Sequence, residues 1–263
     1  MSDTRESSAL ILWDIDHTLL NIAGVSREIY ELAFEEVAGH PLRDLAPMAG
    51  RTEQAIAFET LEMNGVEASQ ALISRFYTAL GAAAESLSSR IRDAGKALPG
   101  AREAIFALQR RPVVQSVVTG NIRSVAGTKL RAFGLAESLD LEVGGYGDDG
   151  SDRATLVRLA RERAEEKYRA SFPGKRTFVI GDTPHDIRGA HDAGVFAVGV
   201  ATGYSSFEEL TECGADLVLT DLTDTEALCG AVRDSQAHES STSFPWPRSP
   251  GTARGTEQRW ACH

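Results

Sequence analysis

Short apolar runs that alternate with amphipathic segments constrain the fold of this chain more than any other feature. Six runs are rich in Val, Ile and Leu, at residues 9–14, 113–120, 139–145, 177–182, 195–200 and 216–220. Such near-continuous apolarity is typical of strands that are buried on both faces. Four intervening segments have helical spacing, at residues 101–110, 122–132, 153–169 and 186–193. This alternation predicts an α/β fold with a parallel sheet.

A helical insert interrupts the alternation after the first apolar run. About a hundred residues separate this run from the next, whereas a strand–helix–strand unit needs roughly thirty. Residues 22–96 carry almost no strand signal and have the spacing of several amphipathic helices. We therefore predict a core domain of residues 9–21 and 97–234, with residues 22–96 as a helical cap. The hinges are expected near residues 19–24 and 96–100.

Composition argues against several classes of partner. The 263 residues carry a net charge of -11, so general attraction to nucleic acid or to an anionic membrane is not expected. No apolar run approaches membrane-spanning length, the start lacks the features of a signal peptide, and the three cysteines fit neither a disulfide nor a zinc pattern. We expect a cytoplasmic protein. Residues 235–263 are rich in Ser, Thr, Pro and Gly, which predicts a disordered tail.

Polar side chains follow three of the apolar runs, at the points where strands are expected to end. They are Asp14 and Asp16 in "LILWDIDHTLL", Thr119, Gly120 and Asn121 in "VVTGN", and Asp182 and Asp186 in "VIGDTPHD". Because the carboxyl ends of parallel strands meet at one edge of a sheet, these groups should share a crevice. Four acids gathered there would repel one another, and a hard divalent cation is the usual remedy. We therefore expect a bound Mg²⁺ ion.

The paired acids of the first run indicate phosphoryl transfer. With a cation present, one carboxylate can attack phosphorus in line and form an aspartyl-phosphate. We assign Asp14 as this nucleophile and Asp16 as the proton donor and later base, provided that burial or neighbouring charge raises the pKa of Asp16. Thr119 and the backbone N–H groups around Gly120 and Asn121 can donate hydrogen bonds to the transferred group.

These motifs, in this order and with a helical insert after the first, resemble those of the haloacid dehalogenase-like (HAD) superfamily. The resemblance covers about residues 9–233 and points to its phosphatase branch with a helical cap of the first type. It implies a Rossmann-like core, Asp14 as nucleophile, Asp16 as acid and base, and Thr119 as a phosphoryl contact. It also implies that Asp14, the backbone carbonyl of Asp16 and Asp182 hold Mg²⁺, assisted by Asp186.

The sequence departs from the family pattern at two positions. Where the resemblance implies a lysine at the start of a helix, "GDDGSDRATLVRLA" has Arg153. A guanidinium can neutralise a phosphate and bridge two carboxylates, so we assign Arg153 to this role, with Lys129 as the alternative. His17 stands where the family commonly has a small residue, and we interpret it as a partly exposed loop histidine rather than a proton shuttle.

The insert also carries a candidate contact to substrate. Gly50, Arg51 and Thr52 resemble the cap loop that many relatives point into the active site, and we assign Arg51 to substrate contact. The alternative is an ordinary helix start that Thr52 caps.

The predicted function is a Mg²⁺-dependent phosphatase that acts on a small phosphorylated metabolite. By family analogy the substrate is phosphoglycolate or a sugar phosphate. Two alternatives remain open at this point: a phosphomutase of the same fold, and a non-enzymatic phosphoryl-accepting module. The helical insert argues against the second, because such a module needs no lid.

Overall fold

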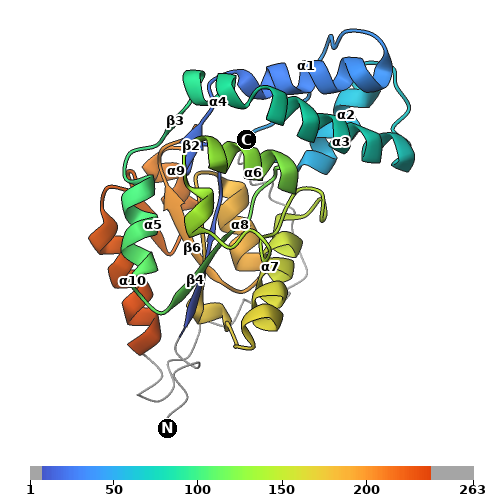
Figure 1. Cartoon of the computed structure of the whole chain (residues 1–263). Helices are drawn as coiled ribbons and strands as arrows, with labels where there is room; N and C mark the ends of the chain where they lie inside the picture. Colours follow the sequence, from blue (N-terminus) through green and yellow to red (C-terminus); the bar gives the residue numbers. More distant parts are fainter. Residues whose placement is uncertain (1–7, 238–263) are drawn as a thin grey trace, which may run out of the picture.

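A five-stranded parallel sheet forms the centre of the molecule (Figure 1). The structure, a computed structural model, describes residues 8–237. The strands are β1 (Ala9–Trp13), β4 (Val113–Val117), β5 (Thr177–Gly181), β6 (Phe196–Val200) and β7 (Leu217–Leu219). Their spatial order is β4-β1-β5-β6-β7, and every neighbouring pair is parallel. The predicted α/β fold with a parallel sheet is therefore confirmed.

Helices cover both faces of this sheet because side chains alternate along β1. Ile11 and Trp13 pack into one cluster with α5 (Ala101–Gln109), α6 (Arg123–Ala132) and α10 (Thr225–Ala237). Leu10 and Leu12 pack on the other face with α7 (Arg153–Tyr168), α8 (Pro184–Asp192) and α9 (Phe207–Glu212). All four side chains are fully buried. Such a strand has no solvent-facing side, which explains its unbroken apolar sequence.

Four further helices lie beyond the carboxyl ends of the strands (Figure 1). They are α1 (Val25–Ala38), α2 (Glu53–Met63), α3 (Gln70–Ser86) and α4 (Ser88–Ala94). A two-stranded antiparallel ribbon of β2 (Leu20–Asn21) and β3 (Lys96–Ala97) joins them to the sheet. This helical layer is called the cap below. The ribbon lies where the hinges are expected, and the domain boundaries themselves stay a prediction.

The apolar run at residues 139–145 is not a strand, contrary to our prediction. It follows a short 3₁₀ helix, η1 (Ala136–Ser138), and only Gly145 pairs with Val118, as an isolated parallel bridge. Asp140 folds the run into a local turn, accepting from the backbone N–H of Glu142 through Oδ1 (3.1 Å) and of Val143 through its carbonyl (3.4 Å). These bonds use the N–H groups that a ladder would need.

Two further expectations concern the end of the chain and membranes. Helix α10 extends to Ala237, so the first three residues of the predicted disordered tail are helical. The remainder of that predicted tail, residues 238–263, lies outside the described residues. A second 3₁₀ helix, η2 (Gly174–Arg176), precedes β5. Within residues 8–237, no helix has the length and apolar character needed to cross a membrane.

Candidate active site

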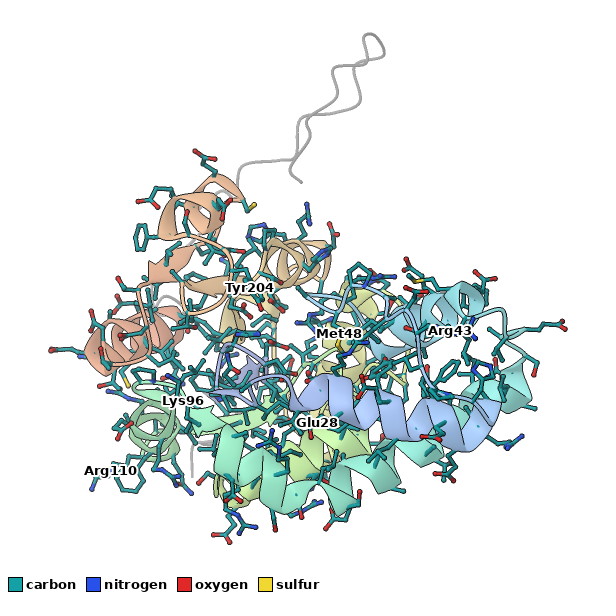
Figure 2. The ribbon with its side chains drawn as sticks, turned by 90° about the horizontal axis from the view of Figure 1, so that it is seen from above. Glu28, Arg43, Met48, Lys96, Arg110 and Tyr204 are labelled. Carbon is teal, nitrogen blue, oxygen red and sulfur yellow. The ribbon has the colours of Figure 1, made fainter. Side chains whose placement is uncertain are left out.

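A cavity of about 530 Å³ lies where the cap meets the carboxyl ends of the strands. Most of the predicted site residues line it, namely Asp14, Asp16, Arg51, Thr119, Gly120, Asn121, Arg153 and Asp182. Met48 lines it from the cap and Tyr204 from the core, as the view from above shows (Figure 2). Asp186 is fully buried and lies behind this lining. The structure thus brings the three sequence motifs together.

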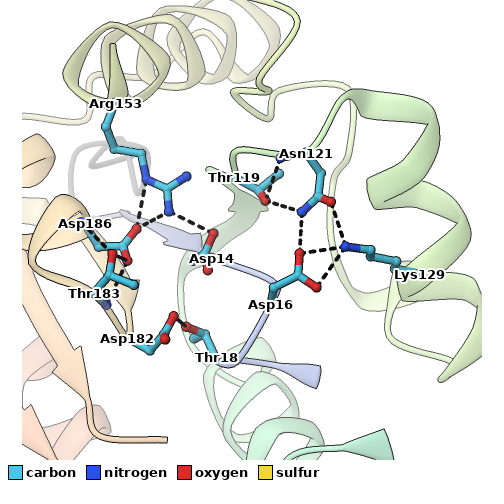
Figure 3. A network of polar contacts seen from close by, with 10 residues as sticks. All are labelled: Asp14, Asp16, Thr18, Thr119, Asn121, Lys129, Arg153, Asp182, Thr183 and Asp186. Carbon is cyan, nitrogen blue, oxygen red and sulfur yellow. Dashed lines mark hydrogen bonds and ion pairs between the residues drawn. The ribbon is translucent and has the colours of Figure 1, made fainter. Parts of the chain in front are cut away.

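Asp14 shares its cation with Asp186 (Figure 3). Arg153, the first residue of α7, donates from Nη2 to Oδ1 of Asp14 (2.9 Å) and from Nε to Oδ1 of Asp186 (2.9 Å). A guanidinium therefore bridges two carboxylates, as expected for Arg153. Its remaining nitrogen, Nη1, is buried and has no hydrogen-bond partner among residues 8–237. Arg153 thus keeps a buried donor that no described residue satisfies.

Three carboxylates form a cluster with the geometry of a metal site. Ligand oxygens of Asp14, Asp182 and Asp186 all lie within 4.8 Å of one another. Both oxygens of Asp186 already accept hydrogen bonds, Oδ1 from Arg153 and Oδ2 from the hydroxyl (2.7 Å) and N–H (3.1 Å) of Thr183. Among the residues that the structure describes, Asp182 accepts a hydrogen bond only from the Thr18 hydroxyl (3.3 Å). Asp14 and Asp182 are thus the two acids best able to hold a cation.

The charge balance of this cluster fits a divalent cation. Burial, together with the neighbouring acids, raises the pKa of Asp14 to about 7 and the pKa of Asp182 to about 9. One guanidinium does not compensate three carboxylates. A hard cation with oxygen ligands would restore the ionised forms. Asp182 is also held tightly, because a Cβ placed on Gly203 would lie 1.7 Å from its Oδ2.

Asp16 has a cation of its own, Lys129, which the sequence suggests only as an alternative to Arg153. Lys129 of α6 donates from Nζ to both carboxylate oxygens of Asp16 (2.8 and 2.7 Å) and to Oδ1 of Asn121 (2.7 Å) (Figure 3). Nδ2 of Asn121 donates to Asp16 in turn (2.7 Å). Arg153 and Lys129 are therefore not alternatives, since each serves one of the two aspartates.

This pairing corrects the expected charge state of Asp16. Burial favours its neutral form, but the ammonium group of Lys129, with hydrogen bonds from Lys129 and Asn121, outweighs burial and lowers the pKa of Asp16. We expected this pKa to be raised. The missed signal is the spacing of α6: Lys129 is only 3% exposed and follows the buried positions Val125 and Ala126 on the core-facing side.

The loop after β4 presents donors to the cavity. The Oγ1 atom of Thr119 accepts from the Asn121 N–H (3.3 Å) and from Asn121 Nδ2 (2.8 Å). Because this oxygen already accepts twice, its own O–H proton remains to be donated. Gly120 lies directly beneath the cap, since a Cβ there would be 2.0 Å from the carbonyl oxygen of Arg51. The Glu53 N–H also donates to the Gly120 carbonyl (2.7 Å).

Arg51 lines the cavity, but its guanidinium is engaged within the cap. It pairs with Glu59 (2.6 Å) and donates to the carbonyl of Pro47 (3.1 Å). Its predicted contact with substrate stays a prediction. Thr52 does occupy the position before α2 in an extended conformation, yet its side chain makes no capping hydrogen bond.

Glu53, the first residue of α2, is a site residue that the sequence analysis missed. Its side chain lines the cavity, is 5% exposed and accepts a hydrogen bond from the Tyr30 hydroxyl. Burial raises its pKa to about 7. A glutamate at the first position of a helix is usually solvent-exposed and interacts favourably with the helix dipole. The sequence alone therefore gives no sign that Glu53 is buried.

His17 has the backbone conformation of a glycine. Its φ angle is 61°, in the left-handed region that side chains with a Cβ rarely adopt. Its Nδ1 lies 3.2 Å from Nδ2 of Asn21, and its ring centroid lies 5.1 Å from that of Tyr204. The side chain is half-buried in the loop after Asp16, which agrees with a loop histidine beside the cavity.

Comparisons with known proteins identify the family of this chain. The sequence profile of the haloacid dehalogenase-like hydrolase family matches residues 11–191. A phosphoglycolate phosphatase from Caulobacter vibrioides is 27% identical over 230 residues, covering 85% of this chain and 91% of that protein. Two solved structures share the fold. A predicted phosphatase from Clostridium acetobutylicum has a TM-score of 0.60, with 18% identity over 85% of this chain and 99% of that one. A hydrolase from Pseudomonas syringae has a TM-score of 0.59, with 21% identity over 86% and 99%.

Proposed function

The chain belongs to the haloacid dehalogenase-like hydrolase family as a phosphatase enzyme, and on this premise we propose that it hydrolyses a small phosphomonoester with the aid of Mg²⁺. The substrate class includes phosphoglycolate, after which the Caulobacter relative is named, and sugar phosphates. One observation carries the proposal. The carboxylates of Asp14, Asp182 and Asp186 meet within 4.8 Å, beside a cavity that two buried cations also line.

The metal would be held by Asp14 and Asp182, together with the backbone carbonyl of Asp16. Asp186 serves instead to hold Arg153 and Thr183, because both of its oxygens are occupied. When bound, Mg²⁺ neutralises and orients the phosphoryl oxygens.

Asp14 acts as the nucleophile. One of its oxygens is held by Arg153 and the other attacks phosphorus, so the P–O bond to the leaving group breaks as an aspartyl-phosphate forms. Nη1 of Arg153 and the hydroxyl of Thr119 donate to the phosphoryl oxygens. Both donors are fixed before substrate arrives, so little reorganisation is needed during the reaction.

Asp16 handles the protons, starting from its ionised form. The negative charge of an incoming phosphate opposes that of Asp16 and raises the pKa of Asp16. The carboxylate then takes up a proton from solvent and donates it to the leaving oxygen. Once the leaving group has departed, the ionised carboxylate accepts a proton from the water that attacks the aspartyl-phosphate. Hydrolysis then regenerates Asp14 and releases inorganic phosphate.

Phosphate release from p-nitrophenyl phosphate, with Mg²⁺ or with EDTA, tests this function. We expect Mg²⁺-dependent turnover, and we expect Asp14→Asn to reduce the rate at least about 10³-fold because the nucleophile is lost. Asp93→Asn makes the same change at an exposed position of α4 and should keep the wild-type rate. Wild-type turnover no higher than that of Asp14→Asn would favour a phosphoryl-accepting module, and phosphate transferred to a sugar would favour a mutase.

A further inference from the structure

Within the described part of the chain, Glu53 is the one carboxylate by which the cap lines the cavity. Its backbone N–H is bonded to the Gly120 carbonyl (2.7 Å), which fixes the start of α2 against the residues that bind the phosphoryl group. The Tyr30 hydroxyl holds Oε1, whereas Oε2 makes no hydrogen bond with any residue in the described part of the chain. One oxygen is thus held in place while the other is available to a ligand.

Glu53 lies where it would contact the leaving group of the substrate rather than the phosphoryl group. The phosphoryl group must sit against Asp14, Thr119 and Arg153, all of which belong to the core. The rest of the substrate then extends toward the cap, where Glu53 lines the same cavity. A side chain on the cap side of the cavity therefore contacts the leaving group.

Among residues 8–237, every Lys and Arg side chain that lines the cavity is already paired, so none is left to balance Glu53. The cationic side chains of the lining are each paired with another carboxylate: Arg27 with Glu31, Arg51 with Glu59, Lys129 with Asp16, and Arg153 with Asp14. Glu53 itself has no ion pair among residues 8–237. A second anionic group on the substrate would therefore meet an acid and find no free cation to receive it.

The other groups around Glu53 also determine which leaving groups this part of the cavity can bind. Asp16 and Asp148 add negative potential, Lys129 adds positive potential while paired with Asp16, and the Tyr30 hydroxyl contributes a hydrogen bond. Tyr77 of α3 is a further neighbour: burial, and then the charge of Glu53, raises the pKa of Tyr77. In either protonation state, the free oxygen of Glu53 can accept a hydrogen bond from a hydroxyl or ammonium group.

We propose that Glu53 selects the leaving group, accepting one that ends in a hydroxyl or ammonium group and rejecting one that ends in a carboxylate. This inference rests on the proposed phosphatase function and narrows its substrates. It favours phosphate esters of polyols, sugars and amino alcohols over phosphoglycolate.

Three phosphate esters whose leaving groups share a two-carbon length provide the test. They are 2-hydroxyethyl phosphate, phosphoethanolamine and 2-phosphoglycolate, which differ in ending in a hydroxyl, an ammonium or a carboxylate group. We expect kcat/KM of the wild-type protein for the first two to exceed that for phosphoglycolate at least about tenfold, because like charges placed together are strongly disfavoured. At pH 8, where Glu53 with its pKa of about 7 is mostly ionised, Glu53→Gln removes the charge and should lower this ratio about tenfold.

A matched control and a second measurement keep the test decisive. Glu62→Gln makes the same change at an exposed position of α2 and should leave the ratio at its wild-type value. The ratio is unaffected by any loss of rate common to all three esters. A wild-type preference for phosphoglycolate, which needs no variant, would overturn the inference, as would an unchanged ratio in Glu53→Gln. Failure of the proposed function would look different, because p-nitrophenyl phosphate would then not be hydrolysed either.

Discussion

Asp14 and Asp16 are separated by one residue, yet the fold gives them opposite surroundings. Asp14 is buried with two further acids and shares the single guanidinium of Arg153, so its pKa is raised to about 7. Asp16 faces a dedicated ammonium group, that of Lys129, and its pKa is lowered. The difference shows that the cation from α6 sets the charge state of Asp16, whereas at Asp14 burial among other acids outweighs the cation from α7.

The comparison also indicates where positive charge is lacking. Around Asp16, one ammonium balances one carboxylate. Around Asp14, one guanidinium faces three carboxylates. A divalent cation is therefore needed on the Asp14 side and not on the Asp16 side. Each of the following experiments disturbs one side and asks whether the other responds.

The largest effect is expected from Asp16→Asn. With p-nitrophenyl phosphate, whose leaving group needs no proton, the aspartyl-phosphate still forms on Asp14. No carboxylate remains to take a proton from the attacking water, so turnover should fall about 10²–10⁴-fold. Intact-protein mass spectrometry of the quenched reaction should detect the trapped phosphoenzyme. Turnover at the wild-type rate would remove Asp16 from its assigned role.

Removal of each cation should separate the two sides. Lys129→Met leaves Asp16 without its ammonium partner, so the pKa of Asp16 rises and the acidic limb of the kcat–pH profile moves to higher pH. Arg153→Ala should leave that limb in place and reduce kcat about 10- to 100-fold through the loss of phosphoryl contacts. Lys129→Arg should restore part of the wild-type profile. An unchanged rate for Arg153→Ala at saturating substrate would remove Arg153 from its assigned role as a phosphoryl contact.

The smallest effect concerns the stability of the metal-free protein. The pKa values of Asp14 and Asp182 rise from 3.8 to about 7 and about 9, so the folded state holds protons that the unfolded state releases. This contribution is complete below about pH 4 and is lost as pH rises through 7 and 9. Mg²⁺ replaces those protons, so the increase in Tm on adding Mg²⁺ should grow from pH 6 to 9.

Differential scanning fluorimetry with Mg²⁺ or EDTA measures this increase. We expect a gain of about 2–8 °C at pH 9 for a chain of this size and a smaller gain at pH 6. Asp182→Asn removes a proposed ligand and should abolish the pH dependence of the gain. Equal gains at every pH would mean that the metal does not replace protons on these acids.

Much of this arrangement was predictable because it depends on local pattern. The apolar runs predict the strands, and parallel strands bring Asp14, Thr119 and Asp182 to one edge. The partner of Asp16 was not predictable, because it depends on the rotation of α6 that aims Lys129 inward. Glu53 depends on how the cap docks, a long-range contact with no local signal. The run at residues 139–145 is not a strand, because Asp140 forms a competing turn.

Gly120 packs between the cap and the core, in the loop that follows β4. On one side it lies against the Arg51 carbonyl, and on the other its own oxygen would be 1.7 Å from a Cβ placed on Gly147. Three chain segments are thus stacked with room for hydrogen atoms alone. Any movement of the cap away from the sheet would therefore also move the loop proposed to bind the phosphoryl group, which would couple cap opening to product release.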